Sequence, residues 1–190
     1  MASEIRPTRK VRILDVGSGP GILTLRLAKQ NPTASLVGID YSPTQVRAAE
    51  RLRIRQQVKS CVFRRGDAVN LPFENNVFDI ALSVGSIKHW PDAVRGLQEI
   101  RRVLGSDGLA FIAEADRDAS EEGFTRFARQ FTAWYVWDRF MRWYLRSAVF
   151  GQSYTCQDAE SLARLSGFDQ VEVEKIKQWP FFFMKQIKSS

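Results

Sequence analysis

Hydrophobic positions along the chain follow two periods, one typical of buried strands and the other of amphipathic helices. Short apolar stretches predict five strands at 11–16, 35–40, 61–68 with its exit loop, 77–84 and 109–114, of which the first is typical of a buried strand and the fourth is apolar enough to be central. Apolar residues spaced three and four apart predict helices between them over 22–31, 43–57 and 93–104. Strands that alternate with helices in this way favour an α/β fold built on a mostly parallel sheet.

The last part of the chain predicts a helix followed by a hairpin. Thr155 with Asp158 three residues later is typical of a helix start, and Gly167 is typical of a helix end. Two strands are expected at 170–178 and 181–187.

The first predicted strand leads into three glycines at every second position, Gly17, Gly19 and Gly21, and then into the first helix. A strand, a glycine turn and a helix N-terminus together let backbone amides approach a bound ligand. The spacing differs from the dinucleotide fingerprint G-x-G-x-x-G, because position 22 is isoleucine. Asp15 just before the glycines would repel a phosphate, so the loop suits a cationic ligand better.

Two further carboxylates stand at the ends of predicted strands. Asp40 lies 19 residues beyond Gly21, about the interval at which a strand-end acid reaches a ribose diol in nucleotide-binding units. Asp67 follows the third strand within the tripeptide Gly66-Asp67-Ala68. For both residues the alternative is a turn position without a ligand.

These motifs together resemble the class I S-adenosylmethionine-dependent methyltransferases, in particular the small-molecule enzymes of ubiquinone and menaquinone biosynthesis. The resemblance is carried by Asp15 with the glycine loop, by 66–73, by the pair Phe78-Asp79 and by the helix-to-strand segment 99–108. It covers residues 11–115 closely and 155–190 in outline. It implies a Rossmann-like, doubly wound α/β fold with a mostly parallel seven-stranded sheet and one antiparallel strand in a C-terminal hairpin.

The resemblance also implies S-adenosylmethionine as cofactor. In that family the glycine loop wraps the methionine part with an acid at its amino group, here Asp15. By the same resemblance Asp40 holds the ribose, and Asp67 with the backbone of Ala68 binds the adenine. The full set of expected cofactor-binding residues is Asp15, Gly17, Ser18, Gly19, Gly21, Asp40, Tyr41, Asp67, Ala68, Ser83 and Val84.

His89, the only histidine, follows the fourth strand in the loop that borders the reacting methyl group in this family. Histidine has an unperturbed pKa of about 6.5, which suits the base that attack by a neutral nucleophile requires. The alternative is a structural histidine that anchors the loop. The implied reaction is an in-line displacement at the sulfonium methyl, for which the protein mainly supplies position.

Residues 116–154 are expected to form a helical, aromatic-rich insertion, with Asp118 and Glu121 as a capping box at its start. The segment holds half of the chain's 22 aromatic residues (13 Phe, 5 Trp and 4 Tyr), more than one helical stripe can bury. We predict a lid over a hydrophobic or aromatic substrate pocket; the alternatives are plain core and a homodimer contact. The first motif begins at residue 11, without the N-terminal helical segment usual in the family. This predicts a more open pocket, closure by the insertion at 116–154 or help from another subunit; the alternative is a truncated or inactive relative.

Composition narrows the class of protein further. The 190 residues suit a single methyltransferase domain over 1–190, and 44% hydrophobic with 26% charged residues is typical of a globular protein. No apolar run reaches the roughly 20 residues that span a bilayer, and no secretory signal is visible, so a cytoplasmic location is expected. Two cysteines and one histidine do not make a disulfide framework or a zinc site, so no metal is expected.

The net charge of +7 is expected to reflect solvated helix faces, although a nucleic acid, an anionic membrane or an acidic substrate would also suit it. The fourth strand ends in Ser83-Val84-Gly85-Ser86 rather than in the Asn/Asp-Pro-Pro-aromatic motif of nucleic-acid amine methylation, which disfavours nucleic acid. We therefore expect methyl transfer to a small, apolar or aromatic metabolite. The alternatives are a catalytically weak or inactive cofactor-binding homologue that acts as an interaction module, and an RNA-directed methyltransferase.

Overall fold

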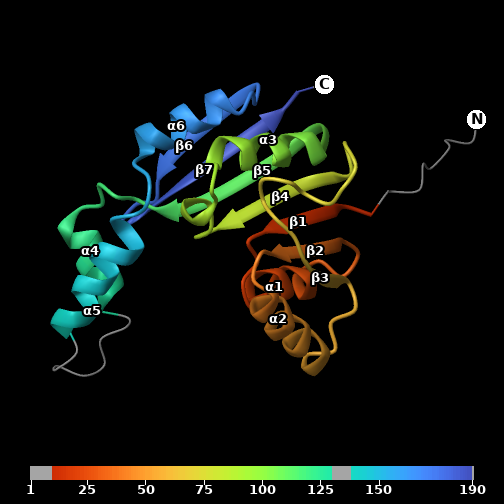
Figure 1. Ribbon diagram of the computed structural model, residues 1–190, viewed down its shortest axis with the longest axis horizontal. Coiled ribbons are helices and arrows are strands. Elements are labelled where there is room, and N and C mark those ends of the chain that lie inside the picture. The colour runs from red at the N-terminus through yellow and green to blue at the C-terminus, as the bar shows by residue number, and fades with distance from the viewer. Residues whose placement is uncertain (1–9, 130–137, 190) are drawn as a thin grey trace, which may run out of the picture.

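The computed structural model describes residues 10–129 and 138–189. Within these residues, seven strands form one sheet in the order β3-β2-β1-β4-β5-β7-β6 (Figure 1). The strands are β1 (Arg12–Val16), β2 (Ser35–Asp40), β3 (Cys61–Arg65), β4 (Phe78–Val84), β5 (Leu104–Ala115), β6 (Gln170–Lys175) and β7 (Phe181–Lys188). Only β7 among them runs against its neighbours, β5 and β6. The expected doubly wound α/β sheet with one antiparallel strand is confirmed.

The helices alternate with the strands as the hydrophobic pattern predicts. They are α1 (Ile22–Gln30), α2 (Pro43–Arg55), α3 (Ala93–Val103), α4 (Glu121–Ala128), α5 (Asp138–Tyr144) and α6 (Cys156–Leu165), with a 3₁₀ turn η1 (Ile87–His89) and a π-helical turn η2 (Leu145–Phe150). The predicted capping box of Thr155 and Asp158 is formed at α6, and Gly167 has the positive φ of 80° that follows many helix ends.

Two local predictions are wrong. Residues 105–108 were expected to form a turn between the helix predicted over 93–104 and the strand predicted at 109–114, but they lie inside β5, which begins at Leu104 and carries a bulge where its pairing with β4 shifts register. Asp107 has a φ of 60° in this irregular stretch, so the turn residues bend the strand instead of ending it. Ser120 rather than Asp118 caps α4, because its hydroxyl accepts the amide of Gly123.

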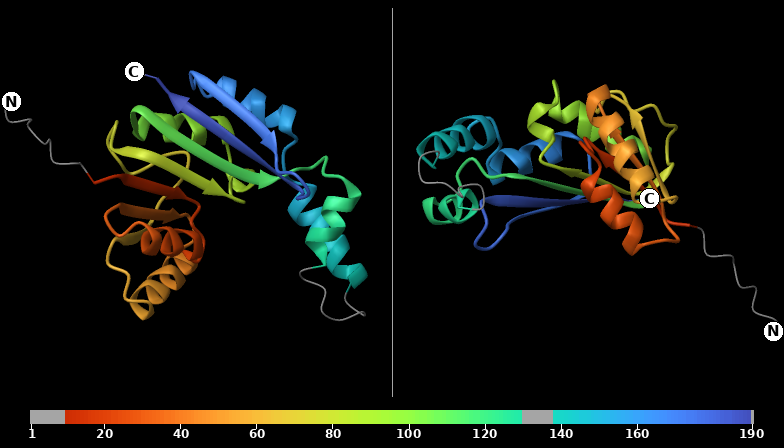
Figure 2. Two further views of the ribbon diagram at one scale, coloured as in Figure 1. Left: turned by 180° about the vertical axis from the view of Figure 1, so that it is seen from behind. Right: turned by 90° about the horizontal axis from the view of Figure 1, so that it is seen from below.

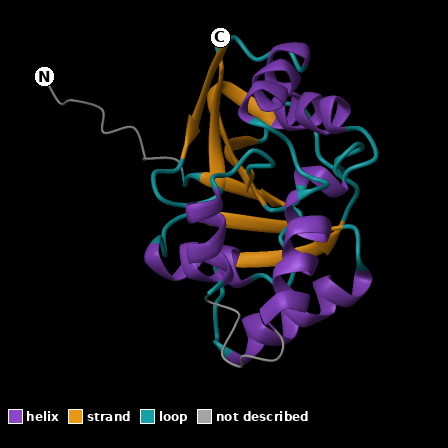
Figure 3. Ribbon diagram, turned by 90° about the vertical axis from the view of Figure 1, so that its left-hand side faces the viewer, coloured by secondary structure: helices purple, strands orange, loops and turns teal. Residues whose placement is uncertain are grey.

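Helices cover the two faces of the sheet unequally (Figure 3). On one face α3 and α6 pack over the largest core cluster, which includes Leu14, Leu97, Ile100 and Met184. On the other face α1 and α2 pack over β1, β2 and β3 around Phe63. Seen from behind, β5 and β7 have none of the described helices in front of them on this second face (Figure 2).

The segment 116–154 extends beyond the carboxyl end of β5 as α4, α5 and η2 (Figure 1). Phe124 and Phe150 meet edge to face at 5.3 Å and form a separate small core with Phe181 of β7. Core packing therefore accounts for part of the aromatic content. Other aromatic side chains of this segment are exposed, namely Phe140, Trp143 and Tyr144. Four aromatic residues of the predicted insertion, Phe131, Trp134, Tyr135 and Trp137, lie outside the described residues.

No helix in the described part of the chain combines the length and the apolar character needed to cross a membrane.

Candidate active site

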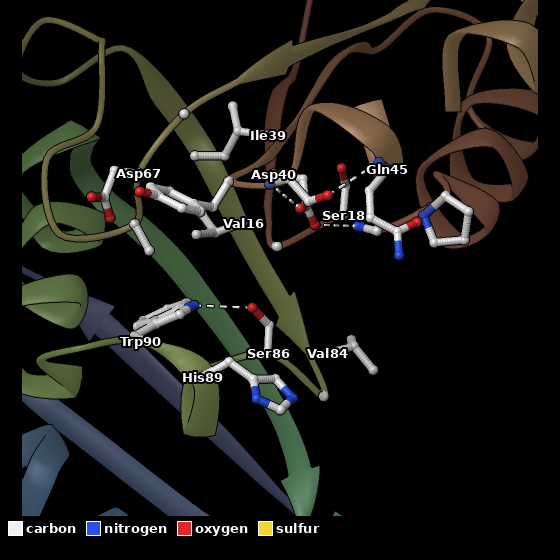
Figure 4. Close-up of a pocket in the computed structure, with 18 of the residues that line it drawn as sticks. Val16, Ser18, Ile39, Asp40, Gln45, Asp67, Val84, Ser86, His89 and Trp90 are labelled. Atoms are coloured by element: carbon white, nitrogen blue, oxygen red, sulfur yellow. Dashed lines mark hydrogen bonds between the residues drawn. The ribbon is translucent and has the colours of Figure 1, made fainter. Parts of the chain in front are cut away.

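A cavity of about 750 Å³ opens at the carboxyl ends of β1, β2 and β4 (Figure 4). This is the point where the strand order reverses between β1 and β4, the usual ligand position in open α/β sheets. Of the residues expected to bind cofactor or substrate, those that line the cavity are Gly17, Ser18, Gly19, Asp40, Tyr41, Asp67, Ala68, Val84 and His89. Asp15, Gly21 and Ser83 do not line it.

The glycine loop takes a conformation that only glycine adopts without strain. Gly17, Gly19 and Gly21 have φ angles of 75°, 53° and 78°. A methyl group on Gly17 would overlap the side chain of Ser86, and one on Gly21 would lie 2.5 Å from the Phe63 ring. Space beside Gly19 is open. Gly21 thus serves helix packing, whereas Gly19 leaves room for a ligand to approach the backbone.

Asp40 connects the glycine loop to the end of β2. One carboxylate oxygen accepts the amide of Gly19 at 2.9 Å, and the other accepts the amide of Ser42 at 2.8 Å. Because a carboxylate offers about four acceptor positions, hydrogen-bonding capacity remains for the hydroxyls of a ligand. The amides of Gly17 and Ser18 both donate to the carbonyl of Ile39, which fixes the loop further.

Replacing Asp40 by alanine is expected to weaken S-adenosylmethionine binding by roughly tenfold to 150-fold, the equivalent of about 1.5–3 kcal/mol for a hydrogen bond to a charged group. Calorimetric titration of the cofactor measures this. Asp40→Asn keeps one acceptor oxygen and should lose less. Equal affinities for the native protein and Asp40→Ala would refute the ribose assignment.

Asp15 is buried beneath the glycine loop and is 2% exposed. Its carboxylate accepts the hydroxyl of Thr24 on α1 at 2.6 Å. Burial raises the pKa of Asp15 to about 6; the Thr24 hydrogen bond opposes this rise, and the charge of Asp40 adds to it. The carboxyl therefore changes charge close to neutral pH.

Cofactor affinity is expected to fall as the pH drops through about 6, by up to roughly tenfold per pH unit, because Asp15 then takes up a proton and no longer attracts a cationic ligand. Titrations between about pH 5 and pH 7 measure this slope. In Asp15→Asn the affinity should be lower and should depend less on pH. His89→Ala is the control and should keep the native slope; an unchanged slope in Asp15→Asn would contradict the assignment.

Asp67 occupies a turn at the rim of the cavity. Its carboxylate accepts a hydrogen bond from the amide of Val69 at 3.1 Å, so the side chain stabilises the turn. The same side chain also lines the cavity. The loop that follows is held from α3, where buried Glu99 accepts the amide of Leu71 at 2.9 Å. Adenine binding by Asp67 and Ala68 stays a prediction.

The end of β4 and the turn after it form the opposite wall. Val84 is 53% exposed, and His89 lies at the end of η1 with its side chain at the surface (Figure 4). Lys88 beside it forms a buried ion pair of 2.7 Å with Glu114 of β5. This pair fixes the turn to the sheet and so fixes the backbone that carries His89. Ser83 is buried, and its hydroxyl has no partner in the described ranges.

Several lining residues escaped the sequence reasoning: Val16, Pro20, Ile39, Ser42, Gln45, Gly66, Gly85, Ser86, Trp90 and Pro91. Most of them flank residues that the motifs did predict, so extending each motif by one or two positions would have found them. Trp90 is different, because its indole donates to the Ser86 hydroxyl at 2.9 Å and packs on Gly96 of α3. That placement depends on tertiary contacts.

A glycine loop at the switch point of such a sheet, with acids at the ends of the next strands, defines an α/β protein of the S-adenosylmethionine-dependent methyltransferase type. A methyltransferase from Aquifex aeolicus that is described as SAM dependent has the same fold, with a TM-score of 0.73 at 15% identity over 93% of this chain and 81% of that one. The model of the methyltransferase domain family matches residues 7–146. The chain belongs to this family.

Curated relatives are similar over about half of the chain. The 2-methyl-6-phytyl-1,4-hydroquinone methyltransferase 2 of Oryza sativa subsp. japonica is 40% identical over 103 residues, which are 54% of this chain and 29% of the relative. The demethylmenaquinone methyltransferase of Lactobacillus johnsonii is 35% identical over 106 residues, 55% of this chain and 43% of the relative. The chain thus matches less than half the length of these relatives.

S-adenosylmethionine is the cofactor of the methyltransferase fold, and the residues present fit it. The open space beside Gly19 and the carboxylates of Asp40 and Asp67 on one cavity provide a close backbone approach and acceptors for hydroxyl and amine groups. Buried Asp15 adds negative charge below the loop, where a cationic amino acid moiety is favoured.

Proposed function

We propose that the protein catalyses methyl transfer from S-adenosylmethionine to a quinone-type aromatic acceptor. One observation carries this: a single cavity brings together the glycine loop, Asp40 and Asp67 at one end and Val84 and His89 at the other. The similarity to methyltransferases named for a phytyl hydroquinone and for demethylmenaquinone supports this class of acceptor.

The cofactor supplies an electrophilic sulfonium methyl group when it is bound. The glycine loop, Asp40 and Asp67, which line the cavity, would hold it, and Val84 on the opposite wall would border the acceptor. We assign His89 as the base that accepts a proton from the acceptor. The Lys88–Glu114 pair keeps the turn with His89 in place, so position is the main contribution of the chain to an in-line displacement.

Turnover of S-adenosylmethionine labelled in its methyl group tests this function. Acceptor panels should contain hydroquinones, naphthoquinols, phenols, amines and thiols, and label is expected in the hydroquinones or naphthoquinols. Cofactor binding without transfer to any acceptor would favour an inactive homologue that acts as an interaction module. Binding of a nicotinamide dinucleotide in place of S-adenosylmethionine would overturn the assignment.

A second candidate, RNA-directed methylation, is favoured by the distribution of charge. Residues 22–65 contain nine basic and two acidic residues, an excess equal to the net charge of +7 of the whole chain. Arg47, Arg51 and Arg55 form an exposed stripe on α2. Salt-dependent retention of the protein on RNA, together with transfer of the labelled methyl group to RNA, would favour this candidate.

We further propose that residues 1–190 act as a single methyltransferase domain in the cytoplasm, with 116–154 as a lid. The described residues of that segment do not line the cavity, so a lid role requires this segment to move toward the acceptor end. A homodimer contact through the segment stays the alternative, and sedimentation of the native protein tests it.

A further inference from the structure

The turn after β4 places the side chain of Ser86 directly against the glycine loop. A methyl group on Gly17 would overlap the Cβ and Oγ atoms of Ser86, so these atoms lie in contact with the loop backbone. Ser86 is half-buried and lines the candidate active-site cavity on the wall opposite Asp40 (Figure 4). A ligand that lies along Gly17 therefore meets the Ser86 hydroxyl.

A hydrogen bond from Trp90 determines how the Ser86 hydroxyl can be used. The indole nitrogen of Trp90 donates to Ser86 Oγ at 2.9 Å, and an indole N–H can only donate. Oγ is therefore the acceptor in this bond, and the hydroxyl proton remains for another partner. Within the described ranges no residue accepts that proton. The cavity is where a partner for it can bind.

Trp90 is itself held in place, so it can orient the hydroxyl. Its ring packs closely against Gly96 of α3, where a methyl group would overlap it. Backbone hydrogen bonds close the same turn. The amide of His89 donates to the carbonyl of Ser86 at 2.9 Å. The amide of Trp90 donates to the carbonyl of Ile87 at 3.2 Å. Ser86 and Trp90 thus keep fixed relative positions.

The amides of the glycine loop are already used within the chain. Each amide hydrogen of residues 17–21 has an internal acceptor: Gly17 and Ser18 donate to the carbonyl of Ile39, Gly19 donates to the carboxylate of Asp40, and Gly21 donates to the carbonyl of Ser18. Pro20 has no amide hydrogen. A ligand group that accepts hydrogen bonds over this loop therefore needs a donor from a neighbouring element, and Ser86 is such a donor.

The methionine part of S-adenosylmethionine has one group of that kind. An ammonium group only donates hydrogen bonds, whereas an ionised carboxylate only accepts them. Buried Asp15 beneath the loop attracts the ammonium group and repels the carboxylate. The carboxylate is therefore the group for which a hydroxyl donor on the facing wall is needed.

We propose that the Ser86 hydroxyl donates a hydrogen bond to the carboxylate of S-adenosylmethionine and that Trp90 is the positioning residue for this contact. The indole N–H keeps Ser86 Oγ as an acceptor on one side, so the hydroxyl proton is directed to the cofactor. Because the acceptor of this proton is charged, the bond is about twice as strong as a neutral one. The inference concerns the cofactor alone and does not depend on the class of methyl acceptor.

Binding of S-adenosylmethionine and of decarboxylated S-adenosylmethionine to the full chain tests the contact without turnover. The two compounds differ by the carboxylate, so the ratio of their dissociation constants reports what the carboxylate contacts. In Ser86→Ala the preference for S-adenosylmethionine should fall about tenfold or more, as expected for a lost hydrogen bond to a charged group. The affinity for the decarboxylated compound should stay close to the native value. An unchanged ratio, or an equal loss for both compounds, overturns the assignment.

Trp90→Phe tests the positioning role. It removes the indole N–H, keeps an aromatic ring against Gly96, and should lower the same ratio by roughly twofold to tenfold. Combined with Ser86→Ala it should lower the ratio no further, because the hydroxyl through which Trp90 acts is then absent. A purely structural role would weaken both compounds alike in Trp90→Phe. If Ser86→Ala does not fold, an unchanged ratio in Trp90→Phe overturns the proposal.

Ser18→Ala is the matched control, because Ser18 is the serine of the glycine loop and also lines the cavity. Its replacement should alter the affinities for both compounds by the same factor. A selective loss of S-adenosylmethionine in Ser18→Ala, with the native ratio in Ser86→Ala, would transfer the contact to Ser18 and overturn the assignment.

Failure of this contact and failure of the proposed function give different results. Native protein that binds both compounds, with a ratio that does not respond to Ser86, removes the Ser86 contact and leaves the methyltransferase function intact. Native protein that binds neither compound removes the cofactor site and the proposed function together. A ratio that responds to Ser86 without methylation of any acceptor in the panel keeps the contact and removes the proposed acceptor.

Discussion

Replacing His89 by alanine is expected to reduce kcat about 100-fold or more and to leave S-adenosylmethionine affinity within about twofold of the native value. A general base contributes about this much to a proton transfer. His89 lines the cavity at the end where we propose that the acceptor binds, on a turn that the buried Lys88–Glu114 pair holds against β5. Its loss should therefore affect the chemical step more than the binding of the cofactor.

Single-turnover kinetics with labelled cofactor measure the chemical step directly. Added imidazole should restore part of the turnover in His89→Ala, because it can occupy the space and accept the proton. His89→Gln keeps a polar side chain and should be as slow as the alanine variant without being rescued to the same extent. A reduction below about tenfold, with no rescue, would assign His89 a structural role only.

Replacing Glu99 by alanine is expected to lower the free energy of unfolding by about 3 kcal/mol, since a buried charged group with several hydrogen bonds is lost. Glu99 is 3% exposed and accepts the amide of Leu71 at 2.9 Å. Arg102 donates to both of its oxygens, at 2.9 and 2.7 Å, and also to the carbonyls of Leu71 and Phe73. One carboxylate thus fixes the loop that follows Asp67.

The pH dependence of unfolding provides an independent check on Glu99. Hydrogen bonds from Arg102 lower the pKa of Glu99 below its usual value. Its contribution is therefore complete above the unfolded pKa of about 4.3 and is lost as the pH falls through the lower folded pKa. Denaturant unfolding of the native protein and Glu99→Ala should converge in that acidic range.

Glu74→Ala is the matched control for this prediction. Glu74 lies in the same connection between β3 and β4 but is exposed, so its replacement should change the free energy of unfolding by less than about 0.5 kcal/mol. Glu99→Gln keeps an acceptor for the Leu71 amide and should fall between the two. Equal losses in Glu99→Ala and Glu74→Ala would show that the network does not stabilise the loop.

Most of the fold could be predicted because local signals and tertiary structure agree over much of the chain. Continuous apolar runs identified β1 and β2, and the pair of Thr155 and Asp158 located the start of α6. The start of β5 could not be predicted in the same way. Residues 105–108 have the composition of a turn, yet Leu104 and Leu109 on either side of them both pair with β4, and Gly108 pairs with β7, so long-range pairing makes this stretch an irregular part of the strand.

The lining of the cavity was predictable where a motif falls at the end of a strand, as at Gly17, Gly19 and Asp40. The lining was less predictable for motif residues that lie beneath the cavity wall. Asp15 and Gly21 belong to the same motif, but the first bonds Thr24 and the second packs against Phe63, so neither lines the cavity. A sequence pattern identifies both kinds of residue without distinguishing them.

The contact between Gly17 and Ser86 joins the first loop to the turn after β4, and Trp90 extends it to α3. A methyl group on Gly96 would overlap the Trp90 ring, just as one on Gly17 would overlap Ser86. Close contacts therefore connect the two walls of the cavity without any ligand. A methyl group added at Gly96, which does not line the cavity, should therefore displace Trp90 and, through Ser86, the glycine loop.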